Sequence, residues 1–588
     1  MKNLSDEDSW TLFCVYAFPD GVGSRVLKDM EKEGRKIVKQ CGNLPLSIKT
    51  IAASLANTTL LSKWELKRRQ LERVVTPIGD PDPIMEILKL SYDSLFAHLK
   101  PCFACLSFFS EDEEIFANYL INLWIGEGFI PGAGEDQWDM GWDWLDQLAQ
   151  LCLVQVYEGH GRFYSKKYCK VHDLLYDLAT HISEEDKSVF SVEEVSSHTS
   201  GAMGWSRILL AKKDLHDLAI SEIHPVYLRT LTLSHNEKIT SIPESLFTTM
   251  RGLRILDLSS TNITALPASL GKMILLKLLN LSGTKIREVP ECVRHMKSLL
   301  FLALPHYCTQ LPVWISELRC LQHLECWDID RMPKGISKLA SLRTLRSDSL
   351  QFSIEEDEFM SLDDLVDMTQ LQELFLIIKH EIELKRLEEG ILAQLVKMRH
   401  LDIRDNTWSA SEKEMELPQF PEKMRAMKHL ESLTLEGFVV PSWICELANM
   451  RELELSRFEF SDFPEFQRMP NLVMLVLELN QKCREFPLAF GESRGFPQLR
   501  ILKIYSFSSL EEFPELEDGA MACLQQFNLW FCPKVKKVEG LERLKNLERF
   551  HYYDSGGTNE WWETLKEGGE YWNKIKAINS HVTITIAY

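Results

Sequence analysis

The sequence contains no apolar run that approaches the roughly 18 residues required by a membrane-spanning helix. Residues 1–8 are mostly polar or acidic and lack the apolar segment of a secretory signal. The 14 cysteines are scattered through 588 residues, which fits free thiols in a reducing compartment better than a disulfide framework. Together these absences predict a cytoplasmic protein.

Basic residues are also in deficit. Lys and Arg number 66 against 86 Asp and Glu, so the net charge is −20. A general binder of nucleic acid or anionic membrane carries the opposite sign. Because 45% of the residues are hydrophobic and 26% charged, the chain has enough apolar side chains for a large core, and wholesale disorder is excluded.

A phosphate-binding loop is missing as well. Such a loop, G-x-x-x-x-G-K-[ST], grips phosphates through backbone N–H groups and a lysine. The pair Gly271-Lys272 is followed by Met273, and no G-x-G-x-x-G motif occurs. Scattered pairs such as Cys102 and Cys105 lack the partners of a four-ligand zinc site. The sequence therefore predicts no catalytic residues, no metal site and no enzyme.

What is present from residue 205 onward is a repeat: an aliphatic residue, two variable residues, an aliphatic, one variable, and an aliphatic. The spacing averages about 25 residues, which is typical of leucine-rich repeats. The repeats start at Leu228, Leu253, Leu276, Leu299, Leu321, Leu342, Leu371, Met398, Leu430, Met450, Leu472, Leu499, Leu524 and Leu547. A further copy at Trp205 would make 15. Prolines such as Pro267 and Pro290 follow these starts by 14 residues and predict an irregular return segment.

The recurring leucines are core residues, because a single repeat cannot bury its own apolar side chains and must stack on its neighbours. Function must therefore lie on the variable positions of the concave strand face, which predict a protein-binding surface. The candidate protein-binding residues are Thr232, Asp257, Asn280, Glu325, Arg346, Phe375, Asp402, Glu454 and Lys503.

Residues 1–204 have helical periodicity instead, followed by a predicted hairpin after Leu153, the order of a winged helix. Winged helices often bind DNA, but residues 101–160 carry a net charge of −11, which argues against phosphate contact. The predicted fold is multidomain: an α-helical bundle plus a winged helix, then an α/β leucine-rich-repeat solenoid, a horseshoe of parallel strands, with a C-terminal cap.

Five segments in order resemble motifs of plant nucleotide-binding leucine-rich-repeat (NB-ARC–LRR) disease-resistance proteins of the coiled-coil class. They are residues 4–13, 41–46, 88–105, 123–130 and 171–175. Residues 41–46 resemble the GLPL motif, with Asn43 where glycine is usual. Residues 171–173 resemble the MHD motif, with Val171 where methionine is usual.

The resemblance implies the following domains: 1–20, the end of a nucleotide-binding domain; 21–90, a helical subdomain; 91–182, a winged helix; 183–204, a linker; and 205–588, the repeats. It also implies that Pro45 contacts the nucleoside and His172 the diphosphate of ADP, and that Asp173 is regulatory. In the alternative, these residues serve only the fold. We expect ADP or ATP in a complete family member and no cofactor in this chain alone, which would begin after the phosphate-loop half.

The resulting function hypothesis is an intracellular plant immune receptor, or a truncated form of one, whose repeats bind a pathogen effector or a guarded host protein. The alternative is a non-receptor repeat scaffold, such as the substrate-binding subunit of a ubiquitin ligase. The net charge of residues 205–350 is +6, whereas the winged helix is acidic. We therefore also expect the winged helix to contact the early repeats. The candidate pairs join Lys272, Lys277, Lys285, Arg287 and Arg294 to Glu111, Asp112, Glu113, Glu114, Glu135 and Asp136.

Overall fold

The computed structural model describes residues 4–19, 24–56, 58–75, 83–132, 135–160, 165–185, 228–326, 329, 331–347, 359–378, 381–405, 417–480, 482–553 and 560–587. These residues form two compact units. The first comprises Met1–Lys285 with Pro290–Phe301, and the second Ile286–Val289 with Leu302–Tyr588. The expected repeat at Trp205 and most of the linker 183–204 lie outside the described residues.

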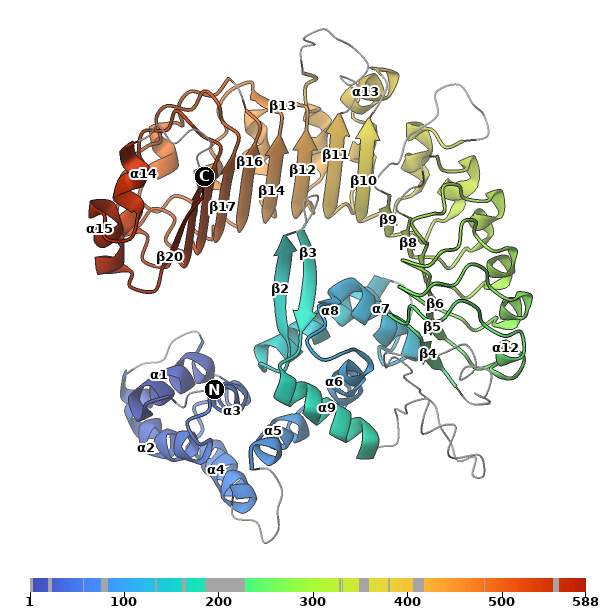
Figure 1. Ribbon diagram of the computed structural model, residues 1–588, viewed down its shortest axis with the longest axis horizontal. Helices are drawn as coiled ribbons and strands as arrows, with labels where there is room; N and C mark the ends of the chain where they lie inside the picture. The colour runs from blue at the N-terminus through green and yellow to red at the C-terminus, as the bar shows by residue number, and fades with distance from the viewer. Residues whose placement is uncertain are drawn as a thin grey trace. The chain divides into compact units, whose positions relative to one another are not determined.

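The first unit opens with a helical group labelled in Figure 1: α1 (Asp6–Ala17), α2 (Ser24–Gln40), α3 (Pro45–Ala53) and α4 (Leu61–Val75). Helix α1 begins at Ser5, whose hydroxyl accepts a hydrogen bond from the Asp8 amide, as an N-cap should. The core of the group is aromatic, with Phe13 packed edge-on against Trp64 at 5.4 Å. Gly34 is required here, because a Cβ atom would clash with the Trp10 ring.

The winged helix follows, as expected. Its elements are α5 (Pro83–Asp93), α6 (Leu99–Ala104), η1 (Cys105–Phe108), β1 (Ile115–Phe116), α7 (Ala117–Glu127), α8 (Glu135–Gln150), β2 (Gln155–His160), β3 (Ser165–Lys170) and α9 (Asp173–Glu185). Strand β3 lies between β1 and β2 in an antiparallel sheet. Helix α7 ends at Gly128, whose φ of 82° is the left-handed conformation that favours glycine at a helix C-terminus.

The first repeats complete this unit, with β4 (Thr230–Thr232), α12 (Leu246–Thr249), β5 (Ile255–Asp257), η2 (Ala268–Lys272), β6 (Leu278–Asn280) and η3 (Glu291–His295). Strands β4, β5 and β6 pair in parallel. Strand β7 (Phe301–Ala303) begins at the last residue of the unit. The repeat strands β4, β5 and β6 are each three residues long, which leaves little of each of these repeats in regular structure.

In the second unit, the strands from β8 onward pair in parallel, each with the strand of the preceding repeat. The repeat strands are β8 (His323–Glu325), β9 (Thr344–Arg346), β10 (Glu373–Ile378), β11 (His400–Asp405), β12 (Ser432–Glu436), β14 (Glu452–Ser456), β16 (Met474–Glu478), β17 (Ile501–Tyr505), β18 (Gln526–Trp530) and β19 (Arg549–Tyr553). From β12 onward these strands are five residues long.

The return segments consist mainly of 3₁₀ turns. They are η4 (Val313–Glu317), η5 (Lys334–Lys338), η6 (Leu362–Asp367), η7 (Ile391–Gln394), η9 (Glu422–Ala426), η10 (Ser442–Glu446), η11 (Phe466–Arg468), η12 (Leu488–Gly491) and η13 (Leu541–Arg543), with helix α13 (Glu381–Glu388) and the short strands β13 (Val439–Val440) and β15 (Glu459–Phe460). Pro267, Pro290 and Pro312 each precede such a turn in an extended conformation, which confirms the expected use of proline.

Each of the 14 strands lies two residues after a repeat start chosen from the sequence, so the repeat phase is confirmed throughout. The start residues are buried; Leu228, Leu371 and Leu547, for example, have no exposed area. Helices α14 (Glu560–Leu565) and α15 (Glu570–Ile578) and strand β20 (Thr583–Ala587) follow the last repeat (Figure 1). There Tyr571 donates a hydrogen bond to the Val538 carbonyl at 3.0 Å, so the aromatic tail closes the core as a cap.

Within the described ranges, no helix combines the length and the apolar character needed to cross a membrane.

Candidate functional site

The GLPL-like segment forms the turn before α3. Gly42 and Asn43 both have left-handed backbone conformations, with φ of 65° and 56°. Asparagine tolerates this conformation better than most residues, which explains how it replaces glycine here. The Asn43 amide also donates a hydrogen bond to the Asp6 carboxylate at 2.8 Å, tying the turn to α1. Pro45 is then the first residue of α3, where a missing N–H costs nothing.

The MHD-like segment forms the start of α9. The His172 carbonyl accepts hydrogen bonds from the Leu175 and Tyr176 amides at 2.7 and 2.9 Å. Its ring Nδ1 accepts a longer one from the Leu174 amide at 3.4 Å, so in the neutral ring Nε2 carries the proton. Asp173 is exposed in the first turn, where a carboxylate favours the helix dipole. Among the described residues no hydrogen bond joins Pro45 to His172, and their nucleotide roles stay predictions.

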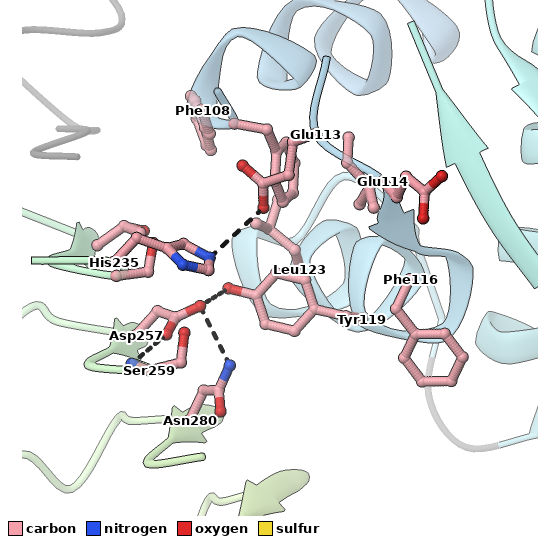
Figure 2. A pocket seen from close by; sticks show the side chains of 14 residues that line it. Phe108, Glu113, Glu114, Phe116, Tyr119, Leu123, His235, Asp257, Ser259 and Asn280 are labelled. Carbon is pink, nitrogen blue, oxygen red and sulfur yellow. Dashed lines mark hydrogen bonds and ion pairs between the residues drawn. The ribbon is translucent and has the colours of Figure 1, made fainter. Parts of the chain in front are cut away.

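A second candidate site lies inside the first unit, where α7 of the winged helix contacts β5 and β6. The Tyr119 hydroxyl donates a hydrogen bond to the Asp257 carboxylate (Figure 2). The same carboxylate accepts from the Ser259 amide at 2.8 Å and from the Asn280 amide group at 3.2 Å. Asp257 is 4% exposed, so three donors compensate for its burial.

One further hydrogen bond secures this junction, by which we mean the contact of α7 and the η1–β1 loop with β4, β5 and β6. The Thr230 hydroxyl donates to the Glu127 carboxylate at the end of α7. Burial, together with the Asp257 charge, raises the pKa of Tyr119 well above its usual value, so Tyr119 stays a donor across the physiological range. The junction is therefore fixed mainly by buried hydrogen bonds.

A cavity of about 170 Å³ opens at the junction. Its walls carry four aromatic rings, those of Phe108, Phe109, Phe116 and Tyr119, and three carboxylates, those of Glu113, Glu114 and Asp257. Figure 2 shows Glu113 pointing toward His235, with 4.0 Å between Glu113 Oε1 and His235 Nε2. The cavity thus combines aromatic faces with negative charge.

The expected contact between winged helix and early repeats is present, but Asp112, Lys272 and Arg294, which were chosen for it from charge, do not make it. Asp112 pairs with Lys170 of the wing at 2.7 Å, and Arg294 with Glu291 of its own repeat at 3.3 Å. Lys272 and Arg294 lie in the return segments η2 and η3, whereas the junction uses strand residues. Of the acidic candidates, Glu113 and Glu114 do line the junction; the side chains of Glu135 and Asp136 lie outside the described residues.

Tyr119, Glu127, Thr230 and His235 were missed by the sequence analysis. Tyr119, Glu127 and Thr230 make specific hydrogen bonds, and His235 an ion pair, between segments more than 100 positions apart. The net charge of a segment does not indicate such contacts. The junction does include the predicted strand-face residues Asp257 and Asn280, and Thr232 lines the cavity beside them. The pattern therefore identified the strand face without identifying what covers it.

In the second unit, several predicted strand-face residues bind one another instead of being open to solvent. Arg346 lies between Glu325 and Glu373, with N–O distances of 3.5 and 2.6 Å. Arg404 pairs with Asp402 at 2.9 Å and lies over the Phe375 ring at 5.1 Å. The contacts of Arg346 with both glutamates and of Arg404 with Phe375 link successive repeats across the strand face.

Glu454 and Lys503 lie farther along the same face. Burial, reinforced by the Asp402 charge, raises the pKa of Glu454 to about 7, and burial lowers the pKa of Lys503. The Lys503 charge acts against the rise at Glu454. This part of the face is thus polar but poorly solvated.

Immediately after four later strands, the chain takes a left-handed conformation at residues other than glycine. Arg457, Leu479, Ser506 and Phe531 have φ between 47° and 58°. Such a conformation costs roughly 1–2 kcal/mol for a residue with a Cβ atom. No sequence signal marked these positions, because glycine is the residue expected there.

Large apolar side chains project from these strand ends. Leu479 is 41% exposed, Trp530 37% and Phe531 42%. Tyr505 packs on Trp530 with ring centroids 5.2 Å apart, and Phe531 on Tyr553 at 4.4 Å. We call Leu479, Tyr505, Trp530, Phe531 and Tyr553 the apolar row. It combines exposure, aromatic pairing and backbone strain, which together are typical of a binding surface.

Two family models match the chain. A leucine-rich repeat region matches residues 216–568, and a disease resistance protein winged helix domain matches residues 108–179. The first covers more than half of the sequence, and the second coincides with the winged-helix elements described above.

Among curated proteins, the chain is similar to disease resistance protein RPP8 of Arabidopsis thaliana, with 26% identity over 98% of this chain and 64% of that protein. It is also similar to disease resistance protein RPH8A of Arabidopsis thaliana, with 27% identity and the same coverage. The chain thus spans about 64% of the length of these relatives. A solved leucine-rich-repeat protein of Leptospira interrogans matches 65% of this chain and 89% of its own, with 19% identity and a TM-score of 0.46.

Proposed function

We propose that this chain is the recognition and regulatory part of an immune receptor. It belongs to the plant disease-resistance proteins with a winged helix and a leucine-rich repeat region. In this proposal the later repeats bind a protein, either a pathogen effector or a guarded host protein. We further propose a cytoplasmic site of action, on the basis of 14 cysteines that form no disulfide frame. The function is recognition and switching, not catalysis.

The observation that carries the recognition proposal is the apolar row. Exposed aromatic side chains dominate the energetics of protein interfaces, because they bury a large area with few rotatable bonds. Trp530 and Phe531 are both more than one-third exposed and are held by ring contacts with Tyr505 and Tyr553. Neighbouring strand-face residues such as Arg346 and Asp402 are already paired within the repeats and contribute mainly to the shape of the surface.

The test is an interaction screen of the 588-residue chain against a library of pathogen effectors and host proteins. Interactors should be lost when Trp530 and Phe531 are both changed to Ser, with a reduction of about 100-fold or more in affinity. Leu488→Ser is the matched control, because Leu488 is 83% exposed but lies in the return turn η12. Interactors that survive the double change, or that are lost with Leu488→Ser as well, would contradict the assignment of the apolar row.

For the nucleotide, we propose that ADP binds at the His172 end of α9 only when a phosphate-loop half completes the site. His172 fits this role, because its Nε2–H is a donor at a helix N-terminus, where anions are favoured. Pro45 would contact the nucleoside. Bound ADP would supply a diphosphate whose contacts hold the resting state. Calorimetry of the chain alone should detect no binding at micromolar ADP, and micromolar affinity would contradict this part of the proposal.

Asp173 is the regulatory residue in this proposal. Its carboxylate favours the first turn of α9, which positions the His172 ring. In a receptor that includes the nucleotide-binding half, Asp173→Val should weaken the resting state and raise spontaneous cell death in a leaf assay. Asp177→Val, an exposed change one turn later, is the control. Equal cell death from both variants would count against a specific role for Asp173.

A further inference from the structure

The cavity at the junction, in the first unit, has features that the receptor proposal does not use. Its volume of about 170 Å³ is below the roughly 300–1,000 Å³ of sites that enclose a nucleotide or a drug-sized ligand. The cavity is large compared with the space of about 10–15 Å³ that a single water molecule needs. The space therefore suits one side chain or one small ion.

The charges on its walls are of one sign. Three lining residues, Glu113, Glu114 and Asp257, carry carboxylates, and no lysine or arginine is among the described residues that line it. A phosphate or carboxylate ligand inside the cavity would be repelled by these carboxylates. His235 is the one basic group on the wall, and at 4.0 Å from Glu113 it lies beyond hydrogen-bond reach.

Acceptor capacity remains on two of these carboxylates. Asp257 accepts three hydrogen bonds, from Tyr119, Ser259 and Asn280, while a carboxylate has about four acceptor positions. Glu113 Oε2 accepts from the Ser110 amide at 2.8 Å, which leaves Oε1 facing the cavity beside His235 (Figure 2). The two acids come from different elements, the loop before β1 and the end of β5.

We propose that this cavity binds the guanidinium group of an arginine side chain presented by a peptide or protein. A guanidinium ion is planar, donates in a fixed fork to carboxylates and stacks on aromatic rings, and Phe108, Phe109 and Tyr119 are among the lining residues. Lysine fits less well, because a compact ammonium ion is more strongly hydrated and gains less from ring faces. The inference goes beyond the receptor proposal and depends on the first unit alone.

Binding there would link the winged helix to the early repeats. A guanidinium group that donates to both Glu113 and Asp257 adds a bridge between the η1–β1 loop and β5, and a ligand that binds only the assembled junction stabilises it by mass action. The bound arginine therefore acts as a clamp on the contact already made by Tyr119 and Asp257.

The test uses the full 588-residue chain and ligand-observed NMR with acetyl-Gly-Arg-Gly-amide. The comparison peptide contains citrulline, which has nearly the same shape as arginine but no charge. The arginine peptide should bind, and the citrulline peptide at least about tenfold more weakly. Free arginine, whose own carboxylate faces the acidic walls, separates a small-molecule source from a peptide source. Equal binding of the arginine and citrulline peptides would overturn the proposal.

Variants locate the site. Glu113→Gln should lower the affinity about tenfold, because it removes the charge whose Oε1 faces the cavity. Glu111→Gln is the matched control: it removes an equal charge from an exposed residue two positions away that does not line the cavity, and should change the affinity less than twofold. Both side chains are at least partly solvent-exposed, so folding is retained and is checked by circular dichroism. Loss of binding in both variants, or in neither, would refute the placement. An interaction screen that fails at the apolar row leaves this result unaffected.

Discussion

Asp257 in the early repeats and Glu454 in the later repeats occupy the same position of the repeat, and the protein treats the two acids differently. Asp257 accepts three hydrogen bonds, one of them from a helix outside the repeats. For Glu454 the described residues supply no hydrogen-bond donor, and burial raises its pKa to about 7. The repeat pattern determines the direction in which a side chain projects. The surroundings of that side chain determine whether its carboxylate is satisfied by hydrogen bonds or is destabilised by burial.

The same contrast runs through the two sets of repeats. The repeat strands β4, β5 and β6 are three residues long, and their polar residues contact the winged helix. The repeat strands β12, β14, β16, β17, β18 and β19 are five residues long, and several of them end at left-handed residues and exposed rings. The early repeats therefore serve an internal contact, and the later repeats offer a free surface in the part of the chain that the structure describes.

The largest expected loss of stability comes from replacing a glycine in a return segment, and it should differ between the two regions. A Cβ atom on Gly540 would clash with the Leu516 carbonyl, and its φ of 81° disfavours alanine. Gly540→Ala should therefore lower the free energy of unfolding by about 3 kcal/mol or more. Gly271→Ala in an early repeat should cost about 1 kcal/mol or less, since the nearest atom, the Cys292 oxygen, is 3.2 Å away. Urea denaturation of both variants checks this, and equal losses would contradict it.

The next effect tests the acid of the early repeats. Asp257→Ala leaves the buried donors of Tyr119, Ser259 and Asn280 without their acceptor, and should cost about 2–3 kcal/mol. Asn528→Ala is the control in a later repeat and should cost about 1 kcal/mol, because the Asn528 side chain makes two long hydrogen bonds of 3.2 Å, donating to Tyr505 and accepting from Gln526. A larger loss of stability from Asn528→Ala than from Asp257→Ala would contradict the contrast between the two regions.

Replacing Glu454, the acid of the later repeats, should raise the stability, whereas replacing Asp257 lowers it. The folded-state pKa of Glu454, about 7, lies above its unfolded value near 4.5. Glu454 is therefore neutral without penalty at low pH, and its contribution to stability is lost as the pH rises through 7. Glu454→Gln should stabilise the protein by about 1–2 kcal/mol at pH 8, with a gain that shrinks at pH 6.5 and again at pH 5.

Urea denaturation at the three pH values measures this gain, with the exposed Glu492→Gln as the control. A destabilising effect of Glu454→Gln at pH 8 would show that the acid is well compensated, like Asp257, and would remove the contrast between the two regions.

The smallest effect concerns the ion pair at the junction. His235 and Glu113 are 4.0 Å apart, and the His235 side chain is 60% exposed. Their coupling in a double-mutant cycle with His235→Ala and Glu113→Gln should be below about 0.5 kcal/mol and should fall further in 0.5 M salt. A coupling above 1 kcal/mol would mean that charge, and not the buried hydrogen bonds of Asp257, holds the junction.

The sequence predicted the repeats well for a physical reason. Each strand follows a buried leucine or methionine at an interval that averages about 25 residues, so Leu228 and Leu547 mark strands in the same way although they are more than 300 positions apart. The winged-helix hairpin was equally visible, because alternating residues flank a glycine-rich turn. Both the repeats and the hairpin were predictable because each produces a periodic pattern of residues close together in the sequence.

The site was less predictable, because its contacts are long-range. Nothing near Tyr119 indicates that its partner is Asp257, 138 positions away. Net charge suggested the right contact through the wrong side chains, since Arg294 satisfies its charge within its own repeat. Leu479 and Phe531 escaped notice because a left-handed conformation without glycine leaves no local pattern. The nucleotide roles of Pro45, His172 and Asp173 stay predictions.

The left-handed residues at the strand ends have a consequence for how such a chain changes under selection. Glycine or asparagine at Leu479 and Phe531 would relieve roughly 1 kcal/mol of strain at each position, so selection for stability alone would favour their loss. The same replacements would remove side chains that are about 40% exposed and available to a partner. A library of variants at these two positions, sorted once for stability and once for binding, should therefore separate into different sequences. Bulky residues that persist there identify the positions at which recognition outweighs folding.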